Sequence, residues 1–238
     1  MCPTAVSDTR PSLLLIAASR GLGLAMAGEF LKKGWRVVAT VREGSDRSRL
    51  DDLARQHQSR LEVETLDITE QDQVTALRRR LSGRIFQMLF VNAGVTNDEK
   101  ETIGSVTTEE FVRVMVTNAL APMRVVESLQ DLVAPDGLIG VMSSGQGSVA
   151  NNTTGLREVY RGSKAALNQF MRSYAARQAA TPRALVLMAP GWVRTDLGGP
   201  QARLTIEESV PNLVDVLLRK QGAPGLEYLD YLGRTVPW

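Results

Sequence analysis

Short apolar runs alternate with amphipathic stretches along the chain. Residues 13–17 form a continuous apolar run of the kind found in strands that are buried on both faces. Residues 24–31 then place apolar side chains at helical spacing, and Gly34 follows them as a typical helix stop. This part of the sequence therefore predicts a strand followed by a helix.

The same alternation continues through the rest of the chain. Further strands are predicted at 36–41, 61–67, 88–91, 137–142, 184–188 and 227–232, the last as a short edge strand. Further helices are predicted at 45–57, 69–81, 107–132, around 160–175, and from 205 onward. Thr69, Thr107 and Thr205 begin capping-box patterns, while Pro122 and Pro211 are expected to kink their helices.

Regular alternation without a repeat or an internal linker indicates one α/β domain. We predict a single-domain doubly wound parallel sheet, a Rossmann fold in three α/β/α layers, over residues 13–238. Residues 1–12 are expected to be a loose N-terminal tail. In such folds ligands bind beyond the carboxyl ends of the strands.

Composition removes several classes of function. Of 238 residues, 28 are basic and 26 acidic, and the one basic run, 78–80, lies on a predicted helix, so we expect no nucleic-acid partner. The single cysteine, Cys2, and the single histidine, His57, exclude a disulfide and a zinc triad, so we expect no metal. No apolar run is long enough to span a bilayer and no leader pattern is visible, which predicts a cytoplasmic protein without a membrane partner.

Tyr160 and Lys164 are the first candidate chemistry. They are four residues apart, so a helix places both side chains on one face. A cation about 5 Å from a phenol, at an effective dielectric near 20, is worth roughly 3 kcal/mol or about two pK units. Such a phenol can exchange a proton near neutral pH. With four tyrosines in the chain, the spacing is also compatible with a chance match on a solvated helix.

Residues 18–23, Ala-Ser-Arg-Gly-Leu-Gly, join the first strand to the first helix. A turn of this kind lets backbone amides approach a pyrophosphate at the helix N-terminus, although two glycines also serve close helix packing. The second strand ends at Arg42 without an acid at its tip, and Arg20 adds a second cation. A cation suits the extra phosphate of NADP, so NADP is favoured over NAD, with Glu43 as the counter-indication.

Six motifs in one order resemble the short-chain dehydrogenase/reductase family. They are the glycine-rich first turn, Asn92-Ala-Gly94, Asn118, Ser144, Tyr160-x-x-x-Lys164 and Pro190-Gly-Trp-Val-Arg-Thr195. The segments SSGQGSVANN and DYLGRTVPW look like the compact carbonyl-reductase-like branch that includes the C-signal proteins.

The resemblance implies a role for each matching residue. Tyr160 would be the proton donor, Lys164 would lower its pKa and bind the nicotinamide ribose, Ser144 would hold the substrate oxygen, and Asn118 would anchor a water chain. Ser143 is an alternative to Ser144, and Asn118 could instead plug a helix kink. The cofactor would contact Ala17, Ser19, Arg20, Gly21, Leu22, Gly23, Arg42, Asp67, Ile68, Asn92, Ala93, Gly94, Tyr160, Lys164, Pro190, Gly191, Val193 and Thr195.

Three departures from the family pattern stand out. Ile16-Ala17 replace the usual Thr-Gly, and if this position needs a positive φ, alanine costs about 1 kcal/mol. The segment 144–160 is longer than usual, so Gln146, Asn151, Asn152 and Arg157 would line or cover the substrate entrance. The segment after Thr195 is short, which suggests an open pocket near Trp192.

The resemblance implies an NADP(H)-dependent oxidoreductase that reduces a ketone or aldehyde to an alcohol, or the reverse. Its partner would be a small carbonyl or alcohol substrate, and two long helices, around Asn118 and Lys164, would form a homodimer or homotetramer. The alternative is a dinucleotide-sensing or signalling protein of the same fold with little or no turnover.

Overall fold

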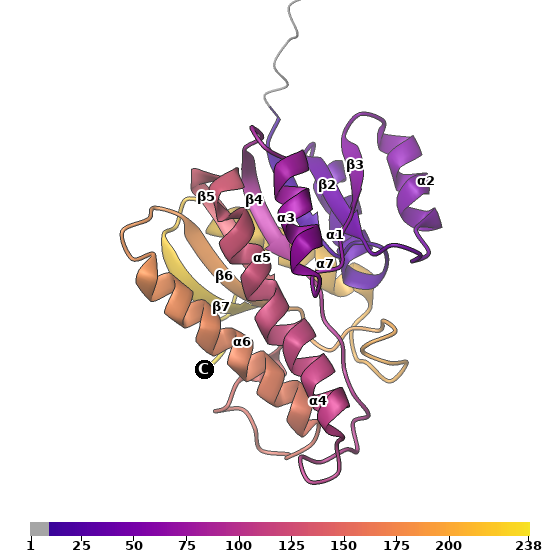
Figure 1. Cartoon of the computed structure of the whole chain (residues 1–238), viewed down its shortest axis with the longest axis vertical. Coiled ribbons are helices and arrows are strands. Elements are labelled where there is room, and N and C mark those ends of the chain that lie inside the picture. Colours follow the sequence, from indigo (N-terminus) through magenta and orange to yellow (C-terminus); the bar gives the residue numbers. More distant parts are fainter. Residues whose placement is uncertain (1–9) are drawn as a thin grey trace, which may run out of the picture.

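A computed structural model describes residues 10–238, and the expected tail lies mostly outside this range (Figure 1). Its centre is a seven-stranded parallel sheet in the order β3-β2-β1-β4-β5-β6-β7. The strands are β1 (Ser12–Ile16), β2 (Arg36–Val41), β3 (Leu61–Thr65), β4 (Phe86–Val91), β5 (Val133–Met142), β6 (Ala184–Ala189) and β7 (Gly225–Asp230). The predicted doubly wound Rossmann fold is confirmed, and β7 is an edge strand as expected.

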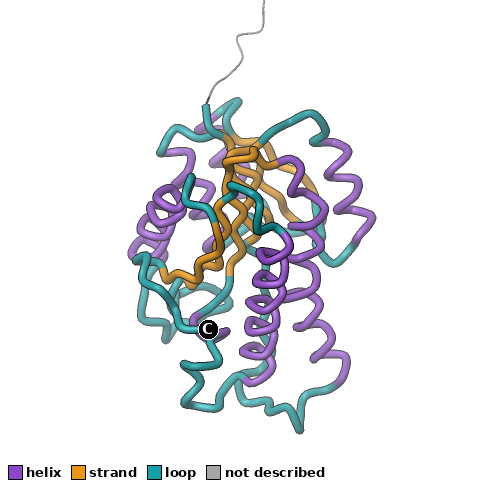
Figure 2. Tube along the Cα trace, turned by 90° about the vertical axis from the view of Figure 1, so that its left-hand side faces the viewer, coloured by secondary structure: helices purple, strands orange, loops and turns teal. Residues whose placement is uncertain are grey.

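Seven α-helices within residues 10–238 connect and cover these strands. They are α1 (Gly21–Lys32), α2 (Ser48–His57), α3 (Gln71–Arg80), α4 (Thr108–Met115), α5 (Ala121–Leu129), α6 (Glu158–Arg177) and α7 (Ile206–Lys220). Figure 2 shows the strands as one central layer with helices on both sides. In Figure 1, α5 and α6 lie side by side in front of the sheet, whereas α7 lies behind it.

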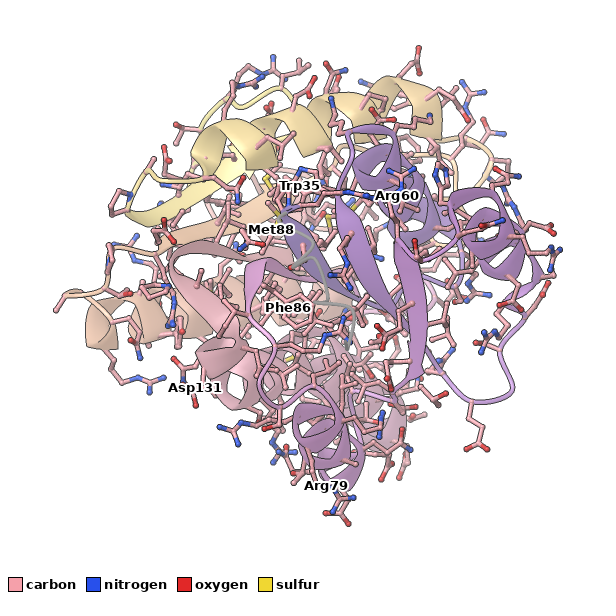
Figure 3. All side chains as sticks on the ribbon, turned by 90° about the horizontal axis from the view of Figure 1, so that it is seen from above. Trp35, Arg60, Arg79, Phe86, Met88 and Asp131 are labelled. Atoms are coloured by element: carbon pink, nitrogen blue, oxygen red, sulfur yellow. The ribbon has the colours of Figure 1, made fainter. Side chains whose placement is uncertain are left out.

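Each face of the sheet has its own apolar core. One core joins the sheet to α3, α5 and α6, and the other joins it to α1, α2 and α7. A register irregularity in β4 distributes its side chains between them: Phe86 packs in the first core and Met88 in the second, although they are two residues apart. Figure 3 shows both residues inside the molecule, with Arg79 and Asp131 at its rim.

The strand register brings distant segments to one edge of the sheet. Ile16 pairs with Val91, Val91 pairs with Val141, and Met142 pairs with Met188. Because all the strands are parallel, their carboxyl ends lie next to one another, and the residues that follow them meet there. This edge is where the candidate residues gather.

Two of the three predicted capping patterns begin helices. Thr205 and Glu208 form a complete capping box on α7, and the Thr107 hydroxyl accepts from the Glu110 amide at the start of α4. The prediction for Thr69 is wrong, because α3 begins at Gln71 and the Thr69 hydroxyl instead donates to Asp67.

The interruption expected near Pro122 is present but lies earlier in the chain. A π-helical turn, Val116–Leu120, separates α4 from α5, and Pro122 lies in the first turn of α5, where proline is tolerated. The π turn, rather than the proline, therefore breaks the regular α-helix here. Asn118 lies at its middle.

Candidate active site

The turn after β1 adopts a conformation that favours glycine. Ala17 has φ of +69°, so the expectation that this alanine occupies a position suited to glycine is confirmed. Thr40 holds it there: the Thr40 hydroxyl accepts from the Ala17 amide at 3.0 Å, and the Thr40 carbonyl accepts from the Ala18 amide at 2.8 Å. Neighbouring hydrogen bonds thus maintain the turn despite the side chain.

The two glycines of the turn are fixed by close approach and by conformation. A Cβ at Gly23 would lie 2.2 Å from the Ala17 carbonyl oxygen and 2.7 Å from Nδ2 of Asn92. Gly21 has φ of +54°, and a Cβ there would lie 3.6 Å from Thr195. The start of α1 therefore meets the segments that follow β1, β4 and β6. Ser19 and Leu22 of this turn are half-buried.

A hollow of about 320 Å³ lies beyond the ends of β2 and β3. It is lined by Arg42, Glu43, Gly44, Ser45, Asp67, Glu70 and Gln73. Ile68, next to Asp67, is buried. One oxygen of the Asp67 carboxylate accepts from both the amide and the hydroxyl of Thr69, which fixes the orientation of this acid.

Arg20 does not line this hollow. Its guanidinium lies 3.4 Å from the Asp196 carboxylate, and both side chains are largely exposed. The role of Arg20 as a second cation at the cofactor site stays a prediction. Arg20 links the first turn to the segment that follows β6.

Asn118 clamps the segment after β4. Its Oδ1 accepts from the Val95 amide and its Nδ2 donates to the Val95 carbonyl, both at 2.8 Å, and Nδ2 also donates to the Ser163 hydroxyl at 2.9 Å. Ser163 in turn donates to the carbonyl of Tyr160 at 2.7 Å. Asn118 is fully buried and therefore ties the Asn92–Val95 segment to the helix of the candidate catalytic tyrosine.

Ala93 and Gly94 lie where Asn118 and Lys164 meet. Ala93 packs on the core that contains α5 and α6. A Cβ at Gly94 would lie 3.4 Å from Nζ of Lys164 and 3.5 Å from Oδ1 of Asn118. The backbone of this segment therefore passes directly beside the ammonium group.

Tyr160 and Lys164 lie on one face of α6, as their spacing predicts. Nζ of Lys164 is 6.0 Å from the centre of the Tyr160 ring and donates to the Met142 carbonyl at 3.0 Å. Burial raises the pKa of Tyr160, and its hydrogen bond with Ser144 lowers it. Burial lowers the pKa of Lys164 to about 8.

The expected lowering of the Tyr160 pKa by Lys164 is not found in the structure. Both groups are almost completely buried, and burial, which disfavours a charged form, raises the pKa of Tyr160 and lowers that of Lys164. The tyrosine is thus held as a protonated phenol.

The two adjacent serines have different partners. Ser143 is buried and its hydroxyl donates to Oδ1 of Asn168 at 2.6 Å. The Ser144 hydroxyl accepts from the Gln146 amide at 3.2 Å and forms the hydrogen bond with Tyr160. Ser144 is therefore the serine that faces the phenol, in agreement with the preferred choice from the sequence.

The segment after β6 is the last of the segments that meet at the carboxyl ends of the strands. Gly191 has φ of +84°, and the Pro190 carbonyl accepts from Ser209 at 2.7 Å. Val193 is buried and bridges to Leu204, which brings Thr195 next to Gly21.

The expected entrance residues divide into two groups. Asn151 and Asn152 are exposed. Gln146 is half-buried, and the Arg157 guanidinium binds Glu99 at 2.7 Å, joining the loops before α4 and α6. Trp192 is 44% exposed and its indole donates to the Gly198 carbonyl at 2.7 Å, so its ring stands at the rim of the site.

Three residues of this edge were not predicted from the sequence. Thr40 is the one polar residue in the otherwise apolar run 37–41. Asn168 follows Lys164 by one helical turn, next to the apolar stripe of the helix. Both were therefore visible in the sequence as polar positions in apolar patterns. Tyr228 donates to the Ser144 carbonyl from β7, 84 residues further along the chain. No local pattern connects these two residues.

The residues present fit a dinucleotide. Three features lie along the carboxyl ends of the strands. They are a turn without room for a side chain at Gly23, a hollow whose lining includes a cation and an oriented carboxylate, and a buried lysine beside the Gly94 backbone. Over residues 10–238 there is no group of three metal-binding side chains and no helix long and apolar enough to cross a membrane.

Comparison with known proteins agrees with this geometry. The family described as enoyl-(acyl carrier protein) reductase matches residues 16–211. A Burkholderia multivorans protein assigned to the short-chain dehydrogenases/reductases, solved with bound NADP, is 66% identical; the alignment covers 96% of this chain and 100% of that one, with a TM-score of 0.95. A carbonyl reductase from Pseudomonas aeruginosa in complex with NADP is 33% identical, with 97% and 100% coverage and a TM-score of 0.89.

Curated relatives include a protein named C-signal. The C-signal of Myxococcus xanthus is 35% identical over 153 residues, which are 63% of this chain and 92% of that protein. The family match, the relatives and the shared fold lead to one conclusion: the chain belongs to the short-chain dehydrogenase/reductase family of oxidoreductases.

Proposed function

We propose that this protein is an NADPH-dependent reductase of ketones or aldehydes in which Tyr160 is the general acid. The observation that supports it most directly is the buried phenol of Tyr160, hydrogen-bonded to Ser144 and sharing a helix face with Lys164. NADPH, when bound, supplies the hydride. The chain itself supplies the proton and holds the carbonyl oxygen.

Burial favours the protonated phenol, which is the form that can donate to a developing alkoxide. The Ser144 hydroxyl can bind the same substrate oxygen and so orient it toward Tyr160. Lys164 has a pKa of about 8 and can accept or release a proton near neutral pH. Asn118 holds the Gly94 segment beside Lys164 and is the proposed anchor of the water path that restores the proton.

The cofactor preference rests on Arg42. It is the one cation among the residues that line the hollow beyond β2, and a cation suits an additional phosphate. Glu43, Asp67 and Glu70 line the same hollow, and Glu43 is the counter-indication. Solved relatives carry NADP, which supports the same preference. Arg42→Asp is expected to weaken NADPH binding at least tenfold more than NADH binding in titration calorimetry. Equal losses for the two cofactors would contradict this role.

Tyr160→Phe tests the proton donor. Turnover of a carbonyl panel with NADPH, followed at the nicotinamide absorbance, should fall at least a hundredfold while NADPH affinity changes less than twofold. The matched control is Tyr174→Phe, which removes another buried phenol of α6 whose hydroxyl donates to Gln130 at 2.9 Å. Retained activity in Tyr160→Phe would exclude this mechanism.

A dinucleotide-sensing protein with little turnover is the second candidate, favoured by the strained Ala17 and by the similarity to C-signal. Tight NADPH binding without turnover of any carbonyl or alcohol would support it. The retained Tyr160, Lys164 and Ser144 favour the enzyme.

The proposed oligomer uses the helices around Asn118 and Lys164. Val112 of α4, Leu120 of the π turn and Phe170 of α6 are all more than one-third exposed. Light scattering should give a mass of two or four chains, and Phe170→Asp should lower it.

A further inference from the structure

Tyr228 is a buried phenol that contacts the catalytic edge from β7. It is 1% exposed, and its hydroxyl donates to the backbone carbonyl of Ser144. The same phenol lies within hydrogen-bonding reach of the side chains of Asn168 and Ser143. One hydroxyl thus stands at the point where β5, β7 and α6 meet.

The 143–147 segment is also held from the side of α6. Nδ2 of Asn168 donates to the Gly147 carbonyl at 3.2 Å, and Oδ1 of Asn168 accepts from Ser143. A Cβ at Gly147 would lie 2.9 Å from Cβ of Lys164, so the segment passes as close to the helix as a backbone can. Ser144 therefore lies in a strip of backbone fixed from both sides.

Trp238 covers Tyr228 from the outside. Their ring centres are 5.5 Å apart with an interplanar angle of 54°, and the Arg172 guanidinium lies 4.5 Å from the centre of the Trp238 ring. The Trp238 carbonyl accepts from the Ala150 amide at 3.1 Å. Trp238 thus packs on Tyr228 and at the same time holds the loop that follows Ser144.

We propose that Tyr228, covered by Trp238, is a positioning residue that holds Ser144 against Tyr160. This inference rests on the proposed reductase function, in which Ser144 binds the substrate oxygen. The Ser144 carbonyl also accepts from the Gly147 amide at 2.8 Å, a bond within the segment itself. Without the phenol hydroxyl, it keeps this local bond but loses the bond that ties the segment to β7, and the segment can shift. Displacement of an orienting group by about 1 Å can cost a hundredfold in rate.

Tyr228→Phe removes the hydroxyl and leaves the ring packed against Trp238. We expect kcat for carbonyl reduction to fall about ten- to a hundredfold, with NADPH affinity changed less than twofold. Because the hydrogen bond with Ser144 lowers the pKa of Tyr160, its loss should also move the high-pH limb of activity to higher pH. A kcat within twofold of wild type would overturn the proposal.

Tyr174→Phe is the matched control. Tyr174 is also a buried phenol, and its hydroxyl donates to the side chain of Gln130. It lies on α6 fourteen residues, or about 21 Å, beyond Tyr160 and so away from the reacting groups. It should lose comparable stability and retain kcat within twofold. If both variants lose activity equally, Tyr228 has only a structural role. Trp238→Ala provides a second route, with an expected smaller fall in kcat.

Amide hydrogen exchange of residues 144–152 separates this inference from the proposed function. Tyr228→Phe and Trp238→Ala should exchange at least tenfold faster than wild type in this segment, whereas Tyr174→Phe should not. Faster exchange in a protein that turns over no carbonyl would retain the positioning role and reject the reductase. Unchanged exchange in both variants would reject the positioning role even if the wild type is active.

Discussion

The side-chain amide of Asn92 donates to the carbonyl oxygen of Ala17 at 2.9 Å and so joins the ends of β4 and β1. The same carbonyl oxygen is the atom that a side chain at Gly23 would meet. Asn92 therefore helps to hold Ala17 in a conformation that alanine rarely adopts. The dinucleotide turn is shaped by its neighbours as much as by its own glycines.

Ala17→Gly should stabilise the protein. An L-residue with φ of +69° is strained by about 1 kcal/mol or more, and the gain on substitution is reduced by the greater flexibility of glycine in the unfolded chain. We expect a net gain of about 0.5–1 kcal/mol, seen as a rise of about 1–4 °C in Tm. Ala18→Gly is the control: Ala18 is fully buried without a positive φ, so that variant should be less stable. A lower Tm for Ala17→Gly would show that the strain is absent.

Gly23→Ala should disrupt the turn. Its methyl group would lie 2.2 Å from the Ala17 carbonyl oxygen, and a backbone atom cannot yield without moving β1 or α1. We expect a loss of about 2–3 kcal/mol in the free energy of unfolding and at least tenfold weaker NADPH binding, measured by denaturant titration and calorimetry. Gly28→Ala, on the same helix, would place its methyl 3.9 Å from Leu53 and should be neutral or stabilising. Equal behaviour of the two variants would contradict the steric argument.

Lys164 should make stability depend on pH. Its pKa is about 8 in the folded protein and 10.5 when unperturbed, so between these values the unfolded chain binds more protons than the folded one. The free energy of unfolding from this group therefore rises with pH from about 8 to about 10, by at most about 1.4 kcal/mol per pH unit. Above pH 10 the raised pKa of Tyr160 acts in the opposite direction, because the unfolded chain loses that proton first.

Lys164→Met isolates this contribution. The difference in the free energy of unfolding between wild type and variant should shift in favour of wild type between pH 7 and 9.5, measured by urea titration without ligand. Parallel curves for the two proteins over this range would rule out the lowered pKa.

Much of the fold could be read from the sequence because buried parallel strands leave continuous apolar runs. Residues 36–41 were predicted to the residue, and β1 begins at Ser12, one position before the apolar run. The start of β5 at Val133 was missed, since Pro135 and Asp136 interrupt the apolar pattern there. Thr69 failed as a helix start because Asp67, two residues earlier, binds its hydroxyl.

The candidate site was predictable where a short sequence motif marks the residues concerned. Tyr160, Lys164 and the glycine-rich turn all lie in such motifs. The pKa of Tyr160 could not be predicted from spacing, because spacing gives the distance to a charge and says nothing of burial. The ion pair of Arg20 could not be predicted for a similar reason: its partner, Asp196, is known only once the segment after β6 is folded against the first turn.

The π-helical turn at 116–120 has a consequence for insertions and deletions. A π turn contains one residue more than the α-helical turn it replaces, so removing one residue there would restore a continuous α-helix. That deletion would rotate α4 by about 100° relative to α5 and carry Asn118 away from Val95. The length of this stretch is therefore as constrained as its composition, and a chain one residue shorter here would have to secure the Val95 backbone by other means.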